Sequence, residues 1–189
     1  MRIIAGRHRG RALQAPPGEA TRPTADRVRQ ALFDMLWHAP WGGRMTIQDQ
    51  LVLDAFAGTG ALGLEALSRG ADHATFLETG RAALAALRAN IAACGEEART
   101  AVLATDATRP PRARVPCGLV FLDPPYGKGL VPRAVAALEA AGWIAPGAII
   151  VAETGAQEAL DLPGCERLAA RTHGAAMLHV LRAGGENGC

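Results

Sequence analysis

The sequence predicts a single α/β domain built on a doubly wound, mostly parallel sheet. After residue 50, short apolar segments alternate with longer segments of helical periodicity, at the spacing of βαβ units. A glycine-rich segment directly follows the first apolar segment, where this fold turns from strand into helix. The chain of 189 residues is long enough to bury the core of one such domain. We expect the last two strands to form an antiparallel hairpin.

Residues 1–24 predict a basic hairpin arm that precedes the domain. Short apolar pairs around Gly6 and Gly10 favour a twisted hairpin over a helix, and the prolines at 16 and 17 then break regular structure. Residues 1–29 carry seven arginines and two acidic residues, a net charge of +5, whereas the whole chain carries +2. Such an arm is expected where a chain meets a phosphate backbone, although a solvated, arginine-biased tail would look similar. The candidate nucleic-acid contacts are Arg2, Arg7, Arg9, Arg11 and Arg22.

Residues 25–183 contain the remaining elements, and residues 184–189 predict a flexible tail. Apolar residues from Val28 to Leu36 recur at helical spacing, which predicts a helix at about 25–37, with Thr24 or Asp26 as its N-cap. The other expected helices are 60–68, 81–94 and 130–141. The expected strands are 51–53, 73–78, 100–103, 118–122, 148–153, 167–172 and 176–181.

The composition argues against several classes of protein. Four scattered cysteines form no C-x-x-C pair, so the sequence predicts neither a zinc site nor a disulfide framework, and we expect no metal. No apolar run approaches the roughly 20 residues that a membrane helix needs, and the first residues do not resemble a signal peptide. We therefore expect a cytoplasmic monomer without membrane association.

The glycine-rich segment Asp54-Ala-Phe-Ala-Gly58-Thr-Gly60-Ala-Leu-Gly63 predicts a nucleoside-binding turn. Its glycines allow the backbone to approach a ligand closely. Gly58 to Gly63 satisfies the dinucleotide fingerprint, and Glu78 lies about 20 residues on, where an acid binds ribose hydroxyls. Asp54 instead favours a cationic ligand, because its carboxylate can accept from an ammonium group but would repel a pyrophosphate. We therefore predict that the ligand is S-adenosylmethionine.

This segment also resembles the first motif of class I methyltransferases, at Asp54, Phe56, Gly58 and Gly60. The resemblance implies that Glu78 binds the ribose and that Asp106, after the third strand of the domain, binds the adenine amino group. Two alternatives stay open. Asp54 and Glu78 can be ordinary strand-end carboxylates, and Asp106 can lie in a surface turn or cap a helix.

The segment Asp123-Pro124-Pro125-Tyr126 follows a strongly apolar strand and predicts methylation of an exocyclic base amine. Such an amine is a poor nucleophile because its lone pair is delocalised into the ring, so acceptors must draw that lone pair out. The Asp123 carboxylate can take one N–H and the Pro124 carbonyl the other, while two prolines stiffen the turn and remove backbone donors. Tyr126 can stack on a flipped base. The alternative is an ordinary strand followed by a Pro-Pro turn.

The chain as a whole resembles the RsmD-type family of bacterial methyltransferases. The matching segments are Met1-Arg-Ile-Ile-Ala-Gly-Arg7, Arg9-Gly-Arg11, Arg22-Pro-Thr24 through Arg29, Asp54 through Arg69, Asp123 through Tyr126 followed by Gly129-Leu130, and Gly142-Trp-Ile144. The resemblance implies a Rossmann-like class I methyltransferase fold and transfer of a methyl group to guanine N2 of 16S ribosomal RNA. The implied substrate is an assembled or partly assembled small ribosomal subunit. It also implies that the segment from Arg22 to Arg29 folds over the cofactor, where Arg27 could pair with the carboxylate and Thr24 could donate to it; the alternative is an N-capped helix with solvated arginines.

Two other functions remain possible from the sequence. The motif at Asp123 would also serve adenine N6 or cytosine N4 of DNA, although no separate target-recognition domain is evident. The glycine turn alone would also suit a non-catalytic RNA-binding or NAD-binding protein. The five histidines show no clustered spacing, and we assign them no catalytic role.

Overall fold

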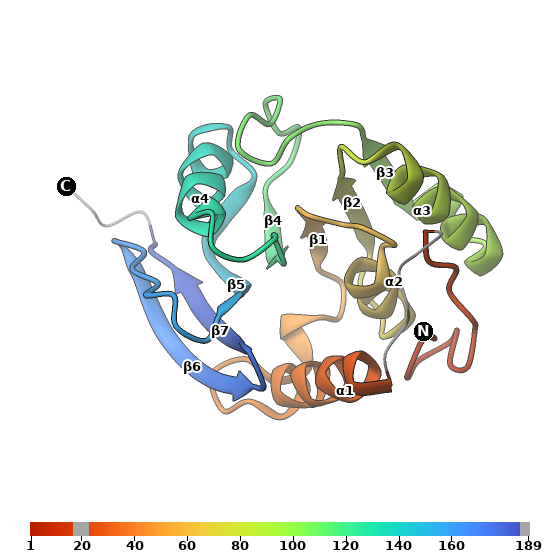
Figure 1. Cartoon of the computed structure of the whole chain (residues 1–189), viewed down its shortest axis with the longest axis horizontal. Helices are drawn as coiled ribbons and strands as arrows, with labels where there is room; N and C mark the ends of the chain where they lie inside the picture. The colour runs from red at the N-terminus through yellow and green to blue at the C-terminus, as the bar shows by residue number, and fades with distance from the viewer. Residues whose placement is uncertain (17–22, 186–189) are drawn as a thin grey trace.

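The computed structural model describes residues 1–16 and 23–185, which form a seven-stranded sheet flanked by helices (Figure 1). The strands lie in the order β3-β2-β1-β4-β5-β7-β6. Their bounds are β1 Leu51–Asp54, β2 His73–Leu77, β3 Thr100–Leu103, β4 Cys117–Leu122, β5 Ile144–Gly155, β6 Cys165–His173 and β7 Ala176–Ala183. The helices are α1 Pro23–His38, α2 Ala61–Ser68, α3 Arg81–Cys94 and α4 Leu130–Ala140, with short 3-10 helices at Gly43–Thr46 and Glu97–Arg99. This order confirms the doubly wound sheet, whose direction of winding reverses between β1 and β4.

The direction of the strands confirms the expected antiparallel ending. Strands β1 to β5 pair in parallel, and β7 inserts between β5 and β6, antiparallel to both. The expected bounds 148–153 for the fifth strand were too short, because β5 already pairs at Ile144 with Cys117. Gly147 adopts a φ of +74° there, and the pairing shifts register between Cys117 and Leu119. The Pro146-Gly147 pair therefore produces an irregularity within the strand and does not end it.

Side chains from alternate strand positions form two separate hydrophobic clusters, one on each face of the sheet. Phe121 packs with Phe33 of α1 and with residues of α2 and α3. Its neighbour Val120 packs on the other face, against α4 and Trp143. Because successive strand residues point to opposite faces, the unbroken apolar sequence of β4 is explained by burial on both sides.

The N-terminal arm is a short hairpin, as expected, although its ladder is minimal. Arg2 and Ala12 form a single antiparallel bridge, extended by hydrogen bonds between Ile3 and both Gly10 and Arg11. Helix α1 then begins at Pro23, two residues before the expected start, because proline is well suited to the first turn of a helix. In the described ranges, no helix is long and apolar enough to cross a membrane.

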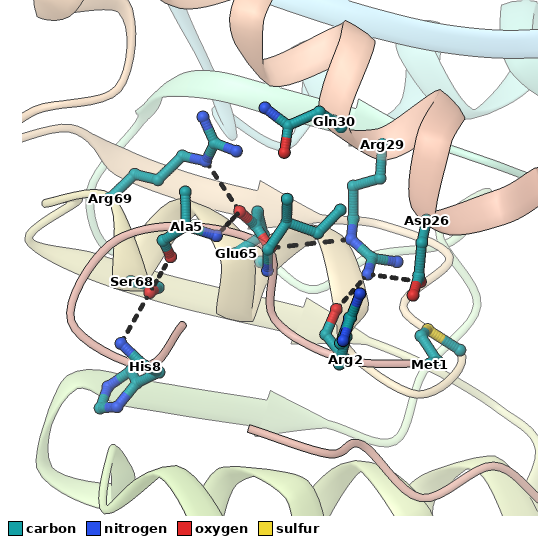
Figure 2. Close-up of polar contacts among 12 residues, drawn as sticks. Met1, Arg2, Ala5, His8, Asp26, Arg29, Gln30, Glu65, Ser68 and Arg69 are labelled. Atoms are coloured by element: carbon teal, nitrogen blue, oxygen red, sulfur yellow. Dashed lines mark hydrogen bonds and ion pairs between the residues drawn. The ribbon is translucent and has the colours of Figure 1, made fainter. Parts of the chain in front are cut away.

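The arm is attached to the body of the domain through α2 (Figure 2). Glu65, 0% exposed, accepts hydrogen bonds from Ile4 N at 2.8 Å and from Ala5 N at 3.0 Å. The Ser68 hydroxyl donates to the Ala5 carbonyl and accepts from His8 N at 3.0 Å. A buried carboxylate bound by backbone N–H groups is costly to separate, so residues 4–8 are fixed to α2 and do not form a free tail.

A second attachment point lies on α3. Asn90, 0% exposed, accepts a hydrogen bond from Gln14 N at 2.7 Å and donates to the Gln14 carbonyl at 3.0 Å. Its amide also donates to the carbonyl of Thr59, in the glycine-rich segment, at 2.9 Å. One buried side chain therefore connects Gln14 of the arm to the predicted nucleoside-binding turn. Figure 1 shows the arm beside α2 and α3, on the side of the molecule away from β6.

Candidate functional site

Four acidic side chains lie at the carboxyl ends of neighbouring parallel strands. Asp54 ends β1, Glu78 and Asp123 follow β2 and β4, and Glu153 lies near the end of β5. Two cavities of about 640 and 610 Å³ adjoin this edge, within the size range of small-ligand sites. Phe56, Gly58, Asp123 and Tyr126 line both cavities. Open α/β folds bind ligands at this end of the sheet, where the parallel strands have their carboxyl ends.

The glycine-rich segment turns sharply between β1 and α2. Gly58 and Gly60 have φ values of +52° and +79°, in the left-handed region that favours glycine. A Cβ atom on Gly60 would lie 2.4 Å from the Leu87 side chain, whereas a Cβ atom on Gly58 would meet nothing within 4 Å. Gly60 is therefore required for packing and lines neither cavity. Gly58 leaves its backbone open to a ligand.

Asp54 lies at the base of the larger cavity and is almost completely buried, at 2% exposed. Its Oδ2 accepts a hydrogen bond from Gly63 N at 3.0 Å. Burial raises the pKa of Asp54 to about 7; the Gly63 hydrogen bond opposes this shift and the charge of Glu78 adds to it. A carboxylate in this setting is stabilised by a cation, so the site fits an ammonium group better than an anion.

The smaller cavity carries the residues predicted to bind a nucleoside. Glu78 Oε2 accepts from Gly58 N at 2.8 Å, and Oε1 accepts from Thr79 N and Gly80 N at 2.7 and 2.6 Å. Asp106 lines the same cavity, and its Oδ1 accepts from the backbone and the hydroxyl of Thr108. These hydrogen bonds hold the pKa of Asp106 below its usual value. Asp106 therefore caps a turn and also faces the cavity.

Asp123 occupies the rim shared by the two cavities. Its side chain is exposed at the mouth of these cavities, yet the protein packed around it partly desolvates the carboxyl group and raises its pKa to about 7, and the charges of Glu153 and Asp54 add to the effect. Pro124 is buried and Pro125 exposed, and both line the smaller cavity. Tyr126 is 45% exposed, and its hydroxyl donates a hydrogen bond to Glu153. The motif therefore presents one carboxylate and one accessible aromatic ring where the cavities meet.

Glu158 fixes the loop that follows this motif. Its Oε1 accepts from Gly127 N at 3.0 Å, and its Oε2 accepts from Gly155 N at 2.7 Å. The carboxylate thereby joins the Tyr126 loop to the end of β5. Rigid support of this kind limits the movement of Tyr126 and Asp123.

Among the residues of the larger cavity that sequence reasoning missed are one acid and one arginine. Glu153 follows the apolar end of β5, the same signal that identified Asp54 and Glu78, so the sequence could have identified it. Arg29 of α1 is only 6% exposed; its Nη2 donates to the Arg2 carbonyl and, at 3.0 Å, to Asp26. Figure 2 shows its guanidinium between the arm and α2, with Nε 3.8 Å from Glu65 Oε2. No local pattern distinguishes this arginine from its exposed neighbours.

Other predicted residues lie away from the cavities or outside the residues that the structure describes. Arg27 is exposed on α1 and lines neither cavity, so the geometry favours Arg29 in its place. Thr24 lies in the first turn of α1, but its side chain, like the whole of Arg22, is outside the described residues.

The arginines of the arm differ in their surroundings. Arg2, Arg9 and Arg11 are exposed. Arg7 forms an ion pair at 2.8 Å with the buried Glu96, which also binds His8 and Arg99. Arg7 therefore helps to hold the arm on the body. Contact of any of these residues with nucleic acid stays a prediction.

Comparison with known proteins gives consistent matches over nearly the whole chain. A family model described as conserved hypothetical protein 95 matches residues 1–182. Ribosomal RNA small subunit methyltransferase D of Escherichia coli is 41% identical over 160 residues, which cover 85% of this chain and 77% of that protein. The Haemophilus influenzae protein of the same name is 37% identical over 86% of this chain and 83% of its own length. Among solved structures, the Escherichia coli protein yhhF has a TM-score of 0.83 at 34% identity, covering 98% of this chain and 99% of that chain.

Proposed function

Because this chain belongs to the conserved hypothetical protein 95 family, as a relative of the ribosomal RNA small subunit methyltransferase D proteins, we propose that it methylates guanine N2 in 16S ribosomal RNA. Its fold is the Rossmann-like methyltransferase fold, and its cofactor is S-adenosylmethionine. The observation that carries the proposal is the position of Asp123 and Tyr126 on the rim shared by the two cavities. The smaller cavity then holds the nucleoside of the cofactor, and the target amine meets Asp123 and Pro124 where the two cavities adjoin.

The residues present fit this cofactor. Glu78 and Asp106 in the smaller cavity suit ribose hydroxyls and an adenine amino group, both of which donate to carboxylates. Asp54 suits the ammonium of the methionine end, and the Arg29 guanidinium in the same cavity suits its carboxylate. When bound, S-adenosylmethionine supplies a methyl group on positively charged sulfur, which the amine nitrogen displaces while the S–C electron pair stays on sulfur.

Asp123 prepares the amine for this displacement. Its carboxylate accepts one N–H and the Pro124 carbonyl accepts the other, so the nitrogen lone pair turns toward the methyl group. The Tyr126 ring stacks on the flipped base and holds it in place. The rate then derives from orientation and from acceptors already placed for the positive charge that develops on nitrogen. The product ammonium loses its proton to water or to a neighbouring carboxylate.

A small ribosomal subunit, complete or partly assembled, is the proposed substrate, which implies a cytoplasmic location. The exposed arginines of the arm suit a phosphate backbone, whose charge dominates the affinity of such contacts. A target within folded RNA must be unstacked before its amine can reach Asp123, so an accessible loop is the expected site.

The test is transfer of a labelled methyl group from S-adenosylmethionine to small subunits that lack the modification. Digestion to nucleosides should yield labelled N2-methylguanosine. Label in no nucleoside, although the protein binds S-adenosylhomocysteine, would refute the proposal; label in adenine or cytosine would redirect it to another amine. Asp123→Ala should lower the rate by about 10²- to 10³-fold while cofactor affinity stays largely unchanged. Asp72→Ala, at an exposed acid on the turn before β2, serves as the control.

A further inference from the structure

We propose that Glu153 makes the site selective for guanine by accepting the N1–H of the base whose N2 amine is held by Asp123. This inference rests on the proposed function and identifies which atom of the base is recognised. It gives a role to an acid in the larger cavity that the transfer of the methyl group does not itself require.

The pairing of β4 with β5 places the two carboxylates side by side. Leu122 and Ala152 are partners in this parallel register, so Asp123 and Glu153 follow at the same level of neighbouring strands. Both line the larger cavity. Glu153 is also paired with Leu178 of β7, so the sheet holds its backbone on that side. A side chain on a central strand is positioned more accurately than one on a loop.

The hydrogen-bonding edges of the bases distinguish guanine at such a pair of acceptors. In guanine, the N1–H lies directly beside the N2 amine, so adjacent carboxylates meet donor hydrogens only. In adenine and cytosine, the ring nitrogen beside the exocyclic amine is an unprotonated acceptor. A second carboxylate there would face a lone pair and repel it. A site built around a donor rejects a base that lacks it, because the bound base covers the partly buried carboxylate of Glu153 and leaves this acceptor unpaired.

Glu153 also accepts the Tyr126 hydroxyl hydrogen bond, so a merely supporting role must be separated from base recognition. An ionised carboxylate offers about four lone-pair sites and can accept from both the phenol and the base. Tyr126→Phe removes only the phenol contact and leaves the stacking ring. Glu153→Gln keeps the size of the side chain and replaces one acceptor oxygen with an NH₂ donor.

The experiment uses small subunits reconstituted with 16S ribosomal RNA that carries guanosine or 2-aminopurine riboside at the mapped target. 2-Aminopurine keeps the N2 amine but has no hydrogen on N1. The wild-type protein should prefer guanosine by about 100-fold or more in kcat/KM. Glu153→Gln should slow transfer to guanosine and speed transfer to 2-aminopurine, because its amide can donate to the unprotonated N1. Tyr126→Phe should slow both substrates by the same factor.

Each other outcome overturns the inference. If Glu153→Gln slows both substrates equally, as Tyr126→Phe does, Glu153 only supports the tyrosine. If its affinity for S-adenosylhomocysteine falls tenfold or more, measured by calorimetry, Glu153 belongs to the cofactor site. If the wild-type protein methylates both bases equally well, base selection lies elsewhere, although the proposed function stands. If the wild-type protein methylates guanosine neither in complete nor in partly assembled small subunits, the proposed function and the inference fail together.

Discussion

Replacing Asp54 by asparagine should stabilise the cofactor-free protein at neutral pH. The carboxyl group is 2% exposed, and burial raises its pKa from 3.8 to about 7. Below about pH 4, the group is protonated in both folded and unfolded chains and contributes no difference. Between the two pKa values, only the unfolded chain ionises, so the stability of the wild-type protein falls as pH rises. Above about pH 7, Asp54 is ionised in the folded chain as well, and the loss of stability caused by its burial reaches its full value.

The magnitude follows from the size of this shift. A difference of about three pH units, at about 1.4 kcal/mol each, gives up to about 4 kcal/mol of lost stability. The asparagine oxygen can still accept the hydrogen bond from Gly63 N, so this contact is kept. The stability gained by Asp54→Asn should therefore grow from near zero at about pH 4 to its largest value above about pH 7.

Urea unfolding of the cofactor-free protein at several pH values measures this difference. Asp72→Asn, at an exposed acid, should show no comparable dependence on pH. A difference between Asp54→Asn and the wild-type protein that does not change with pH would refute the reasoning. The same variant should bind S-adenosylhomocysteine more weakly, because the buried charge that destabilises the fold is the one we propose to accept from the ligand ammonium.

Two further predictions concern the arm and the reaction. Gly6→Ala should release the arm and speed its cleavage by trypsin, because the new Cβ would lie 1.8 Å from the Ser68 carbonyl oxygen. Gly10→Ala, with a similar φ but no neighbour within 4 Å, should cost only about 1 kcal/mol, and equal protease sensitivity of the two variants would contradict the clash. Since Asp123 must be ionised to accept an N–H and its pKa is raised to about 7, kcat/KM for RNA at saturating S-adenosylmethionine, where Asp54 is already engaged, should fall about tenfold per pH unit below that value; a flat profile would argue against this role.

The strand ends were predictable because their signals are local. An apolar run followed by an acid and a turn identified Asp54, Glu78 and Asp123. The structure places all three at the carboxyl ends of neighbouring strands. Glu153 carries the same signal but no flanking motif. Its relation to Asp123 depends on the register between β4 and β5, which is set by contacts distant in sequence.

The choice between Arg27 and Arg29 could not be made from the sequence. Two residues apart on a helix point in directions about 200° different, so only one of them can face the body. The partners that favour Arg29, the Arg2 carbonyl and Glu65, lie 27 and 36 positions away in the chain. The docking of the arm on α2 depends on equally distant contacts, although the hairpin itself was predictable from its glycines.

The amide of Asn90 has a thermodynamic consequence for how this protein meets its two ligands. This amide forms hydrogen bonds with two segments at once. One is Gln14 of the arm, and the other is Thr59, which lines the larger cavity. If RNA on the arm changes the affinity for the cofactor through this amide, the cofactor must change the affinity for RNA by the same factor. A measured order of binding would then describe only kinetics, because the coupling free energy is the same along either route.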